Sequence, residues 1–479
     1  ETATALEPFA MPTFIPDPNL GMPLVRQFYE ALAAQIDKGQ LKPGSKLPSV
    51  RQQAREAGVS TMTVTNAYGR LVAENYIEAR AGSGYYVTSA PPPALQRRKP
   101  FVGRTSVDSL WLLQRVYEDD STLLNAGCGW IRPDWLHIDG VRQALASLAR
   151  KKSAGLASYG TPQGYLPLRQ HIETLLAQRS IQAPAHQIVL THGASQALAM
   201  AGRALLQPRD VALVDAPGST NFFATLRSLD LRLAGVERRV DGPDVQALEA
   251  LVQRHRPKVF FTTMHLHNPT GSSCSPTVAY QILRLAEQYD FRIVENDVMA
   301  GLEPPGLPNL ASLDQLKRVI YVGSFAKTVS PSLRVGFVAA SEDVTEKMVY
   351  QKMVGSLTSS ELSEKLLHSV LVDGNYRSHI HRLAQRLAQA QNDVCDGLEA
   401  AGMTLFTRPA GGPFLWAGFP RDIDVQKVAQ EAVSEGLLLA PGLLFYPDQR
   451  PIPWLRFNVC YANDPTLMRF LRRQVDAGG

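Results

Sequence analysis

The fold of this chain is decided by one stretch, Val319-Ile-Tyr-Val-Gly-Ser-Phe-Ala-Lys-Thr-Val-Ser-Pro-Ser-Leu-Arg-Val-Gly-Phe337. Its first four residues are β-branched or aromatic without alternation, which predicts a buried parallel strand. Gly323 and Ser324 are expected to form a loop after this strand. Lys327 follows at the strand's carboxyl end, where open α/β sheets bind ligands, and a desolvated lysine there can condense with an aldehyde. Ser324 and Arg334 beside it both suit a phosphate group.

The composition is that of a globular protein with more than one domain. The chain has 479 residues, of which 45% are hydrophobic and 19% are charged, and this length predicts two or three domains. No apolar stretch approaches the ~20 residues of a membrane helix and no leader pattern precedes the chain, so we expect no membrane partner. The four cysteines are scattered without metal-ligand or redox spacing, which favours a cytoplasmic protein with no metal site.

A small basic module precedes a large neutral one. Residues 21–90 contain eight Lys and Arg against five Asp and Glu, and this surplus indicates a polyanion partner. An amphipathic helix is expected from about Pro23, followed by two short helices that Ser49 and Ser60 cap and that Gly58 separates. A hairpin around Gly82 comes next. Helix, helix-turn-helix and hairpin together predict a winged helix.

This module resembles the GntR family of bacterial DNA-binding domains over about residues 22–88. The likeness rests on Leu47-Pro-Ser-Val-Arg51, Gly58-Val-Ser-Thr-Met-Thr-Val-Thr65 and Gly82-Ser-Gly-Tyr85. It implies that Arg51 holds a phosphate or base of double-stranded DNA and that a wing at Gly82 enters the minor groove. It also implies that recognition-helix hydroxyls face the major groove, namely those of Ser60, Thr61, Thr63 and Thr65. Many family members carry arginine at the position of Thr61, so direct guanine recognition is not expected there. A winged helix that contacts only proteins is the alternative.

The rest of the chain predicts a linker and an α/β domain. Residues 90–109 are rich in proline and charge, which is typical of a tether; Arg97, Arg98 and Lys99 within it either contact DNA phosphates or stay solvated. From about residue 110, helical and strand patterns alternate, which predicts a mostly parallel sheet. The expected organisation is a mobile tail at 1–20, a winged helix-turn-helix at 21–89, a linker at 90–109 and an α/β domain at 110–479.

Motifs across about residues 120–460 resemble, in family order, the fold-type I aminotransferases, which hold pyridoxal 5'-phosphate. The resemblance implies that Lys327 bonds covalently to the cofactor's aldehyde. It implies that Tyr159, in Tyr159-Gly-Thr-Pro-Gln-Gly-Tyr-Leu-Pro-Leu-Arg169, reaches the phosphate bound by the partner subunit of a homodimer. The other phosphate ligands would be Ser324, Arg334 and the amides of Ala194 and Ser195 at a helix start after strand 188–190.

Three further motifs would hold the cofactor ring and an effector. The resemblance implies that Asn268, in His267-Asn-Pro-Thr-Gly271, donates to the phenolic oxygen. It implies that Asp297, which ends strand 291–297, pairs with the ring nitrogen and keeps the ring cationic, because the cationic ring is the electron sink. Arg456, in Trp454-Leu-Arg-Phe-Asn458, would clamp the α-carboxylate of an amino acid, with Gly127 near it.

With the GntR-like module in front, the whole chain resembles the MocR subfamily, in which a winged helix is fused to an aminotransferase-like domain. Two departures affect the site. Ser219 stands where a tyrosine usually stacks on the ring, with Phe222 or Phe223 as substitutes, and no tyrosine follows Asp297. Lost stacking costs about 1 kcal/mol, whereas misaligned reacting groups lose far more rate. We therefore expect cofactor binding with little or no transamination.

The interpretation that follows is a transcriptional regulator whose aminotransferase-like domain senses pyridoxal phosphate or an amine or amino-acid effector. One alternative is a working aminotransferase with an accessory DNA-binding module. The other is a DNA-binding protein whose large domain has lost its cofactor. The effector, the operator and the sign of regulation do not follow from the residues.

Overall fold

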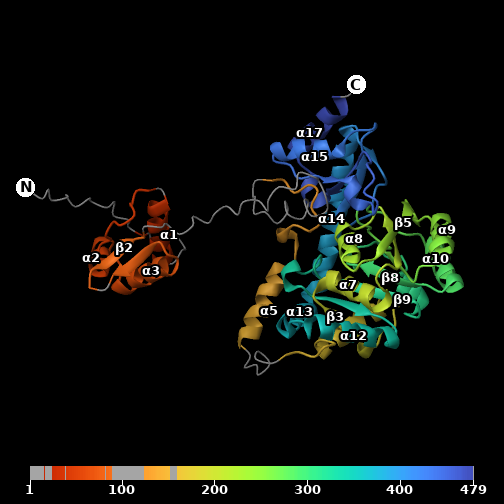
Figure 1. Ribbon diagram of the computed structural model, residues 1–479, viewed down its shortest axis with the longest axis horizontal. Coiled ribbons are helices and arrows are strands. Elements are labelled where there is room, and N and C mark those ends of the chain that lie inside the picture. Colours follow the sequence, from red (N-terminus) through yellow and green to blue (C-terminus); the bar gives the residue numbers. More distant parts are fainter. Residues whose placement is uncertain are drawn as a thin grey trace, which may run out of the picture. The chain divides into compact units, whose positions relative to one another are not determined.

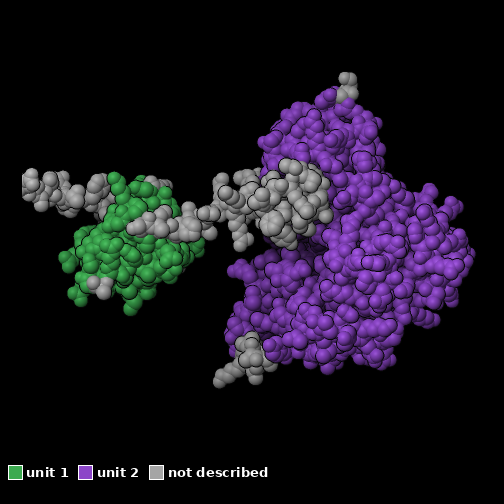
Figure 2. Space-filling model, viewed as in Figure 1, with its two compact units in different colours: residues 1–104 green, residues 105–479 purple. Residues whose placement is uncertain are grey.

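The computed structural model describes residue 16 and residues 24–37, 39–80, 82–88, 123–150 and 159–477. The chain divides into two compact units, residues 1–104 and 105–479 (Figures 1 and 2). The expected linker at 90–109, with Arg97, Arg98 and Lys99, lies outside the described residues. The expected tail at 1–20 lies outside them as well, apart from Pro16.

The small unit is a winged helix-turn-helix. It consists of α1 (Leu24–Asp37), α2 (Val50–Glu56), α3 (Thr61–Ala73), β1 (Ile77–Arg80) and β2 (Gly84–Val87). The predicted caps are confirmed, since the Ser49 hydroxyl accepts from the amide of Gln52 and the Ser60 hydroxyl accepts from the amide of Thr63. Gly58 has φ of 67° and ends the turn between α2 and α3. β1 and β2 pair antiparallel, which confirms the predicted hairpin.

The small unit has a core of its own. Phe28 of α1 and Tyr68 and Leu71 of α3 are fully buried. Val87 of β2 closes the same cluster. Side chains three and four positions apart lie on the same side of a helix, so α1, α3 and the hairpin bury one shared apolar face. This core packs α3 against α1 and the hairpin.

The large unit is built on an eight-stranded sheet with the order β3-β10-β9-β8-β7-β4-β5-β6. β4, β5, β7, β8 and β9 are parallel, and β10 is antiparallel to both β3 and β9, which confirms the predicted mostly parallel sheet. The strands are β3 (Ile188–Thr191), β4 (Val211–Ala216), β5 (Arg232–Arg239), β6 (Gly242–Pro243), β7 (Val259–Thr262), β8 (Arg292–Asp297), β9 (Val319–Ser324) and β10 (Gly336–Ala339).

The decisive stretch forms β9, but its end differs from the prediction. Every residue of β9 is buried and it pairs parallel with β8, as expected. Gly323 and Ser324, predicted as a loop, instead continue the strand, because they pair with Phe337 and Gly336 of β10. A Cβ at Gly323 would lie 2.3 Å from the Phe337 ring, so glycine is required there for close packing and not for a turn.

Helices cover both faces of this sheet, as in Figure 1. One face carries α7 (Gly193–Leu205), α8 (Thr220–Arg227) and α12 (Glu342–Ser356). The other face carries α5 (Ile138–Arg150), α6 (Leu166–Ala177), α9 (Val245–His255), α10 (Pro276–Tyr289), α11 (Leu310–Asp314) and α13 (Glu361–Val372). Burial on both faces explains why the central strands are almost continuously apolar.

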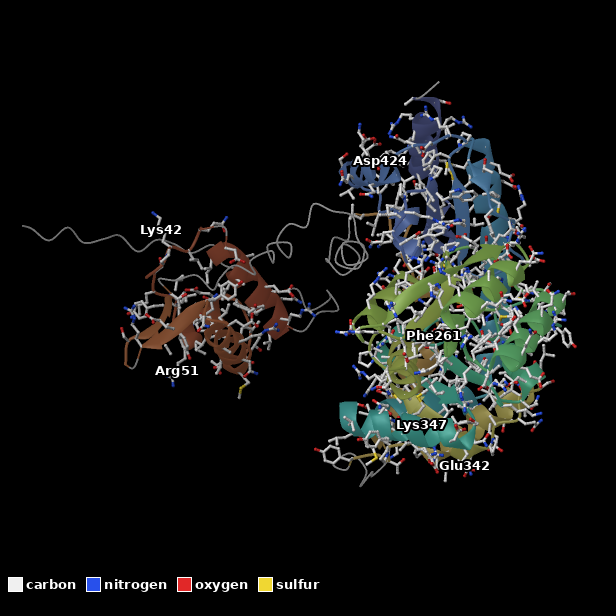
Figure 3. The ribbon with its side chains drawn as sticks, turned by 45° about the vertical axis from the view of Figure 1, so that its right-hand side comes forward. Lys42, Arg51, Phe261, Glu342, Lys347 and Asp424 are labelled. Carbon is white, nitrogen blue, oxygen red and sulfur yellow. The ribbon has the colours of Figure 1, made fainter. Side chains whose placement is uncertain are left out.

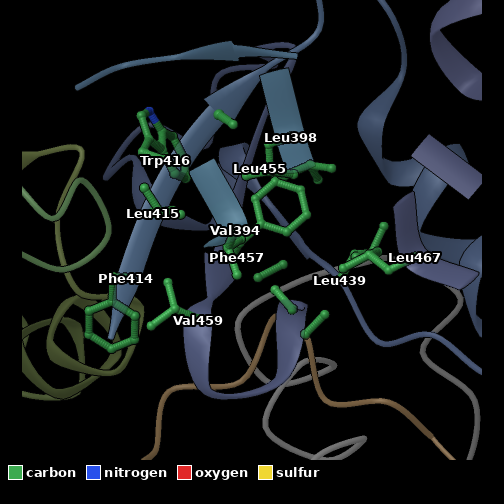
Figure 4. Close-up of a cluster of buried hydrophobic side chains, with 14 of the residues drawn as sticks. Val394, Leu398, Phe414, Leu415, Trp416, Leu439, Leu455, Phe457, Val459 and Leu467 are labelled. Atoms are coloured by element: carbon green, nitrogen blue, oxygen red, sulfur yellow. The ribbon is translucent and has the colours of Figure 1, made fainter. Parts of the chain in front are cut away.

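The last part of the large unit forms a second, smaller layer. A four-stranded sheet has the order β11-β12-β14-β13, and its core includes Val394, Trp416, Leu455 and Leu467 (Figure 4). Its elements are α14 (Asn375–Ala400), β11 (Thr404–Leu405), β12 (Phe414–Gly418), α15 (Val425–Ser434), β13 (Ala440–Pro441), β14 (Trp454–Asn458), α16 (Val459–Ala462) and α17 (Pro465–Asp476). β14 places Arg456 between this layer and the main sheet. No helix in the described part of the chain is long and apolar enough to cross a bilayer.

Candidate functional site

A cavity of about 210 Å³ lies at the carboxyl ends of β4, β7, β8 and β9. Five residues singled out in the sequence line it together: Lys327, Asn268, Ala194, Ser195 and Arg456. They come from distant segments, so only the fold brings them to one place. Among the described residues, no group of His, Cys, Asp and Glu is arranged to hold a metal ion. The amine of Lys327, the amides of Asn268 and the α7 start, and the guanidinium of Arg456 suit an organic ligand with anionic and carbonyl groups.

Lys327 has the properties of a reactive amine. It follows β9 by three residues and is half-buried, and its Nζ donates a hydrogen bond to the carbonyl of Gly129. Burial, together with the positive charges of Arg456 and Arg334, lowers the pKa of Lys327 to about 8. A lysine with this pKa is partly neutral near pH 7, which a nucleophilic amine requires.

This pKa predicts how covalent capture depends on pH. Because only the neutral amine attacks a carbonyl, the rate at which the protein captures pyridoxal phosphate should rise with pH and level off above about 8. An ordinary lysine, with a pKa of about 10.4, would keep accelerating. Borohydride trapping from about pH 6 to about pH 10 measures this rate, with a lysine-containing peptide as the control. A rate that still climbs at the top of this range would contradict a depressed pKa.

Arg334 lies against the start of α7, and both offer hydrogen-bond donors that suit an anion. As first-turn residues, Ala194 and Ser195 have amides without partners inside the helix. The Arg334 guanidinium donates to the carbonyl of His192 over 3.2 Å. A Cβ at Gly193 would lie 3.0 Å from that guanidinium, so glycine admits it. Arg334 is not among the cavity-lining residues, but it lies against the helix start that does line the cavity.

Ser324 lies outside the cavity lining. It is buried at the end of β9, and its hydroxyl accepts a hydrogen bond from the amide of Ala326 over 3.2 Å. In this arrangement Ser324 shapes the turn that leads to Lys327. Its predicted contact with a phosphate stays a prediction.

Arg456 is a buried cation whose described partners are all neutral. Its Nη1 donates to the Asn268 side-chain oxygen over 2.8 Å and its Nη2 donates to the Gly127 carbonyl over 2.7 Å, while Nε is buried without a partner. Burial lowers the pKa of Arg456 to about 10, and no carboxylate among the described residues offsets its charge. The rings of Phe414 and Phe445 flank it. A bound carboxylate would supply the missing partner.

Gly127 acts through its backbone. A Cβ there would lie 2.4 Å from the backbone nitrogen of Ala440, so only glycine allows the close approach. Its carbonyl is aimed at Arg456, while its neighbours Cys128 and Gly129 line the cavity. Gly127 therefore orients the arginine instead of lining the cavity itself.

The loop that carries Asn268 is held by a buried polar network. Asp215 accepts from the hydroxyl of Thr262 over 3.0 Å and lies 3.5 Å from Arg238 and 3.4 Å from His267. Burial lowers the pKa of His267 to about 4, so this imidazole is neutral. The network keeps the turn after β7, and with it Asn268, in place.

The structure does not bring Asp297 into the cavity. Successive side chains of β8 point to opposite faces of the sheet, and Asp297 faces Arg179, 2.8 Å away, and the hydroxyl of Tyr321, 2.7 Å away. Asn296, one residue earlier, lines the cavity instead. The geometry thus favours Asn296 over Asp297 as the β8 side chain that meets a bound ring. Side chains two residues apart on a strand lie on the same face, so counting in steps of two from a residue known to face the site could have identified Asn296.

Three aromatic residues line the cavity, namely Phe222, Trp130 and Phe414. Phe222 packs edge-on against Phe261, with ring centroids 4.9 Å apart. Phe223 is buried in the core between the sheet and α8 and is not in the lining. Of the two substitutes considered for the stacking tyrosine, only Phe222 reaches the cavity. Trp130 was not foreseen, because no local pattern distinguishes it from a packing residue.

Tyr159 lies outside the cavity of its own chain. It is 84% exposed and follows the undescribed residues 151–158. Its predicted contact with a partner subunit stays a prediction.

The predicted DNA-contacting residues are exposed, apart from the partly buried Thr63. Arg51 at the start of α2 is exposed (Figure 3), as is Gly82 with φ of 71° in the hairpin turn. On α3 the Ser60 and Thr63 hydroxyls bond to each other over 2.8 Å, and the Thr65 hydroxyl donates to the carbonyl of Thr61. The α3 hydroxyls are thus partly engaged within the helix. Met62 of α3 is an apolar residue with 66% of its surface exposed, and the sequence analysis did not single it out.

Comparisons with known proteins agree with both units. Residues 133–473 match the family described as aminotransferase class I and II, and residues 24–87 match bacterial regulatory proteins of the gntR family. The uncharacterized HTH-type transcriptional regulator YdcR of Escherichia coli (strain K12) is 28% identical over 451 residues, which are 91% of this chain and 95% of that protein.

Two further relatives extend these likenesses. The probable rhizopine catabolism regulatory protein MocR of Rhizobium meliloti is 28% identical, over 89% of this chain and 87% of that protein. Among solved structures, the kynurenine aminotransferase of Pyrococcus horikoshii has a TM-score of 0.71 at 25% identity, over 80% of this chain and 97% of that one. The large unit therefore has the fold-type I aminotransferase fold, and the chain combines it with a GntR-type domain.

Proposed function

Because the chain belongs to the aminotransferase class I and II family and carries a GntR-type DNA-binding domain ahead of it, we propose that it is a pyridoxal-phosphate-dependent transcriptional regulator. Its large unit binds the cofactor and an amine or amino-acid effector, and its small unit binds double-stranded DNA. The observation that carries this proposal is the cavity in which Lys327 lies with the start of α7 and Arg456.

The residues present fit the phosphate and aldehyde ends of the cofactor. Ala194, Ser195 and Arg334 would hold the phosphate, because free amides and a guanidinium suit a dianion. Lys327, with its lowered pKa, would hold the aldehyde carbon. When bound, pyridoxal phosphate supplies a carbonyl that primary amines capture reversibly. An effector amine would compete with Lys327 for that carbonyl and release the lysine.

Arg456 supports a carboxylate on the effector. This guanidinium is buried, its Nε has no partner, and Asn268 and Gly127 already fix its orientation. A carboxylate can form a bidentate pair with such a group. An amino acid, which has both an amine for the cofactor and a carboxylate for Arg456, is the ligand class that satisfies both ends of the cavity.

We propose that the working form is a cytoplasmic homodimer. The exposure of Tyr159 supports a subunit contact at that point. A dimer would also present two recognition helices to two half-sites. Regulation then requires that the ligand bind two arrangements of the protein with unequal affinity, because only differential binding shifts an equilibrium.

A footprint on the DNA upstream of the protein's own gene tests this function. With pyridoxal phosphate the protected region should change in extent or in the concentration needed for half-protection. The Lys327→Ala variant, which cannot form the covalent link, should protect DNA but show no cofactor response. Identical footprints for wild-type protein with and without cofactor and effector would contradict the regulatory proposal.

A further inference from the structure

The end of β8 presents an amide to the cavity where a carboxylate was expected. We propose that Asn296, and not Asp297, meets the ring nitrogen of the bound cofactor, and that the pocket holds this nitrogen unprotonated. This inference rests on the proposed function, since it concerns a ring bound in the same cavity. It explains how one pocket captures amines without becoming an efficient aminotransferase.

Asp297 is held on the opposite face of the sheet by three hydrogen bonds. One of its oxygens accepts hydrogen bonds from Arg179 over 2.8 Å, from Asn309 over 3.1 Å and from Tyr321 over 2.7 Å. Arg179 also pairs with Glu303. Turning Asp297 toward the cavity would break this set and remove one of the two carboxylates that pair with the half-buried Arg179 guanidinium, so the carboxylate is held away from the ring.

The side-chain amide of Asn296 has hydrogen-bonding capacity that its protein neighbours do not use. Its side-chain oxygen is buried without a hydrogen-bond partner, and its amide nitrogen has only a long contact of 3.5 Å with the hydroxyl of Thr263. Buried polar atoms are nearly always partnered in folded proteins, and those that are not often mark a missing ligand. Since the two ends of an amide can be exchanged, Asn296 can offer a donor to an unprotonated pyridine nitrogen.

The charge of the cavity favours the neutral ring. Of the described residues that line it, Lys327 and Arg456 are basic and none is acidic. Nearby positive charges disfavour a further proton on the ring, and a neutral amide does not compensate for them. Capture of the aldehyde by an amine needs no charge on the ring, whereas the proton shifts of transamination use the cationic ring as electron sink. The site therefore retains capture of amines and loses most of the rate of transamination.

The test uses the full-length protein loaded with pyridoxal phosphate that carries ¹⁵N in its ring. The ¹⁵N chemical shift separates a neutral pyridine from a pyridinium. We expect the neutral signal in wild-type protein and a pyridinium signal in Asn296→Asp, which places a carboxylate in the cavity. The matched variant Asp297→Asn should leave the neutral signal unchanged. A pyridinium signal in wild-type protein would overturn the inference. If that signal then disappeared in Asp297→Asn, Asp297 would be the partner of the ring nitrogen.

A second measurement uses wild-type protein alone, so it remains valid if the Asn296→Asp variant does not fold. An analogue with C–H in place of the ring nitrogen loses one neutral hydrogen bond in wild-type protein, so its Kd should rise by no more than about tenfold relative to pyridoxal phosphate. A carboxylate partner would make that loss about tenfold to a hundredfold, and a rise of this size in wild-type protein would overturn the inference. If borohydride traps no cofactor on Lys327 at all, the proposed function fails and not the assignment of Asn296.

Discussion

Replacement of Lys327 by alanine is expected to remove all borohydride-trappable pyridoxal phosphate from the protein. The reason is that this half-buried amine is the lysine of the cavity, and burial brings its pKa to about 8. Alanine cannot form the covalent link. Intact-mass measurement after reduction should show the mass of the cofactor on wild-type protein and none on the variant.

The fold should survive this substitution. Lys327 donates one hydrogen bond, to the Gly129 carbonyl, so its loss should cost about 1 kcal/mol of unfolding free energy. The control is Lys347→Ala, which removes an exposed lysine of α12 (Figure 3) and should trap cofactor like the wild type. Full labelling of Lys327→Ala at another lysine would show that the reactive amine had been assigned wrongly.

Removal of residues 1–90 is expected to abolish binding to the operator. This segment contains the whole winged helix, and α3 is held by a core that belongs to the small unit alone. Fluorescence anisotropy with labelled operator DNA measures the effect. For the full chain, log K should fall with log salt by about 0.9 for each phosphate neutralised, whereas the truncated chain should show no specific binding at any salt concentration.

A point variant separates DNA contacts from folding. Arg51→Ala should weaken binding on many sequences alike and reduce the salt slope by about one, because Arg51 is expected to contact a phosphate. Arg26, which pairs with Glu30 on α1, offers a matched control whose loss should have little effect. Operator binding by the large unit alone, with the affinity of the full chain, would contradict the division of labour between the two units.

Much of the fold could be predicted because its signals are local. Ser49 and Ser60 cap helices through their own hydroxyls, and Gly58 takes a positive φ between them. These choices depend on a few neighbouring residues. The unbroken apolar runs of the central strands likewise predict that these strands are buried on both faces. For the same reason the end of β9 was missed, since pairing with β10 and not local sequence carries the strand through Ser324.

The site was predictable where a motif carries its residue with it. Lys327, Asn268 and Arg456 are each marked by a short pattern, and they do line one cavity. The orientation of β8 has no such mark. Whether Asn296 or Asp297 faces the ligand depends on where Arg179, Asn309 and Tyr321 stand, and these residues come from three other segments of the chain.

By itself the sequence predicted the winged helix, the mostly parallel sheet and Lys327 as the candidate reactive lysine, because strand burial, helix caps and motif spacing are properties of neighbouring residues. Only the tertiary structure decided that an amide at position 296 faces the cavity while the carboxylate at 297 turns away. It also decided that Arg456 is buried without an acidic partner among the described residues. The reason is physical: partners far apart in the chain compete for each charged group, and packing selects which of them meet.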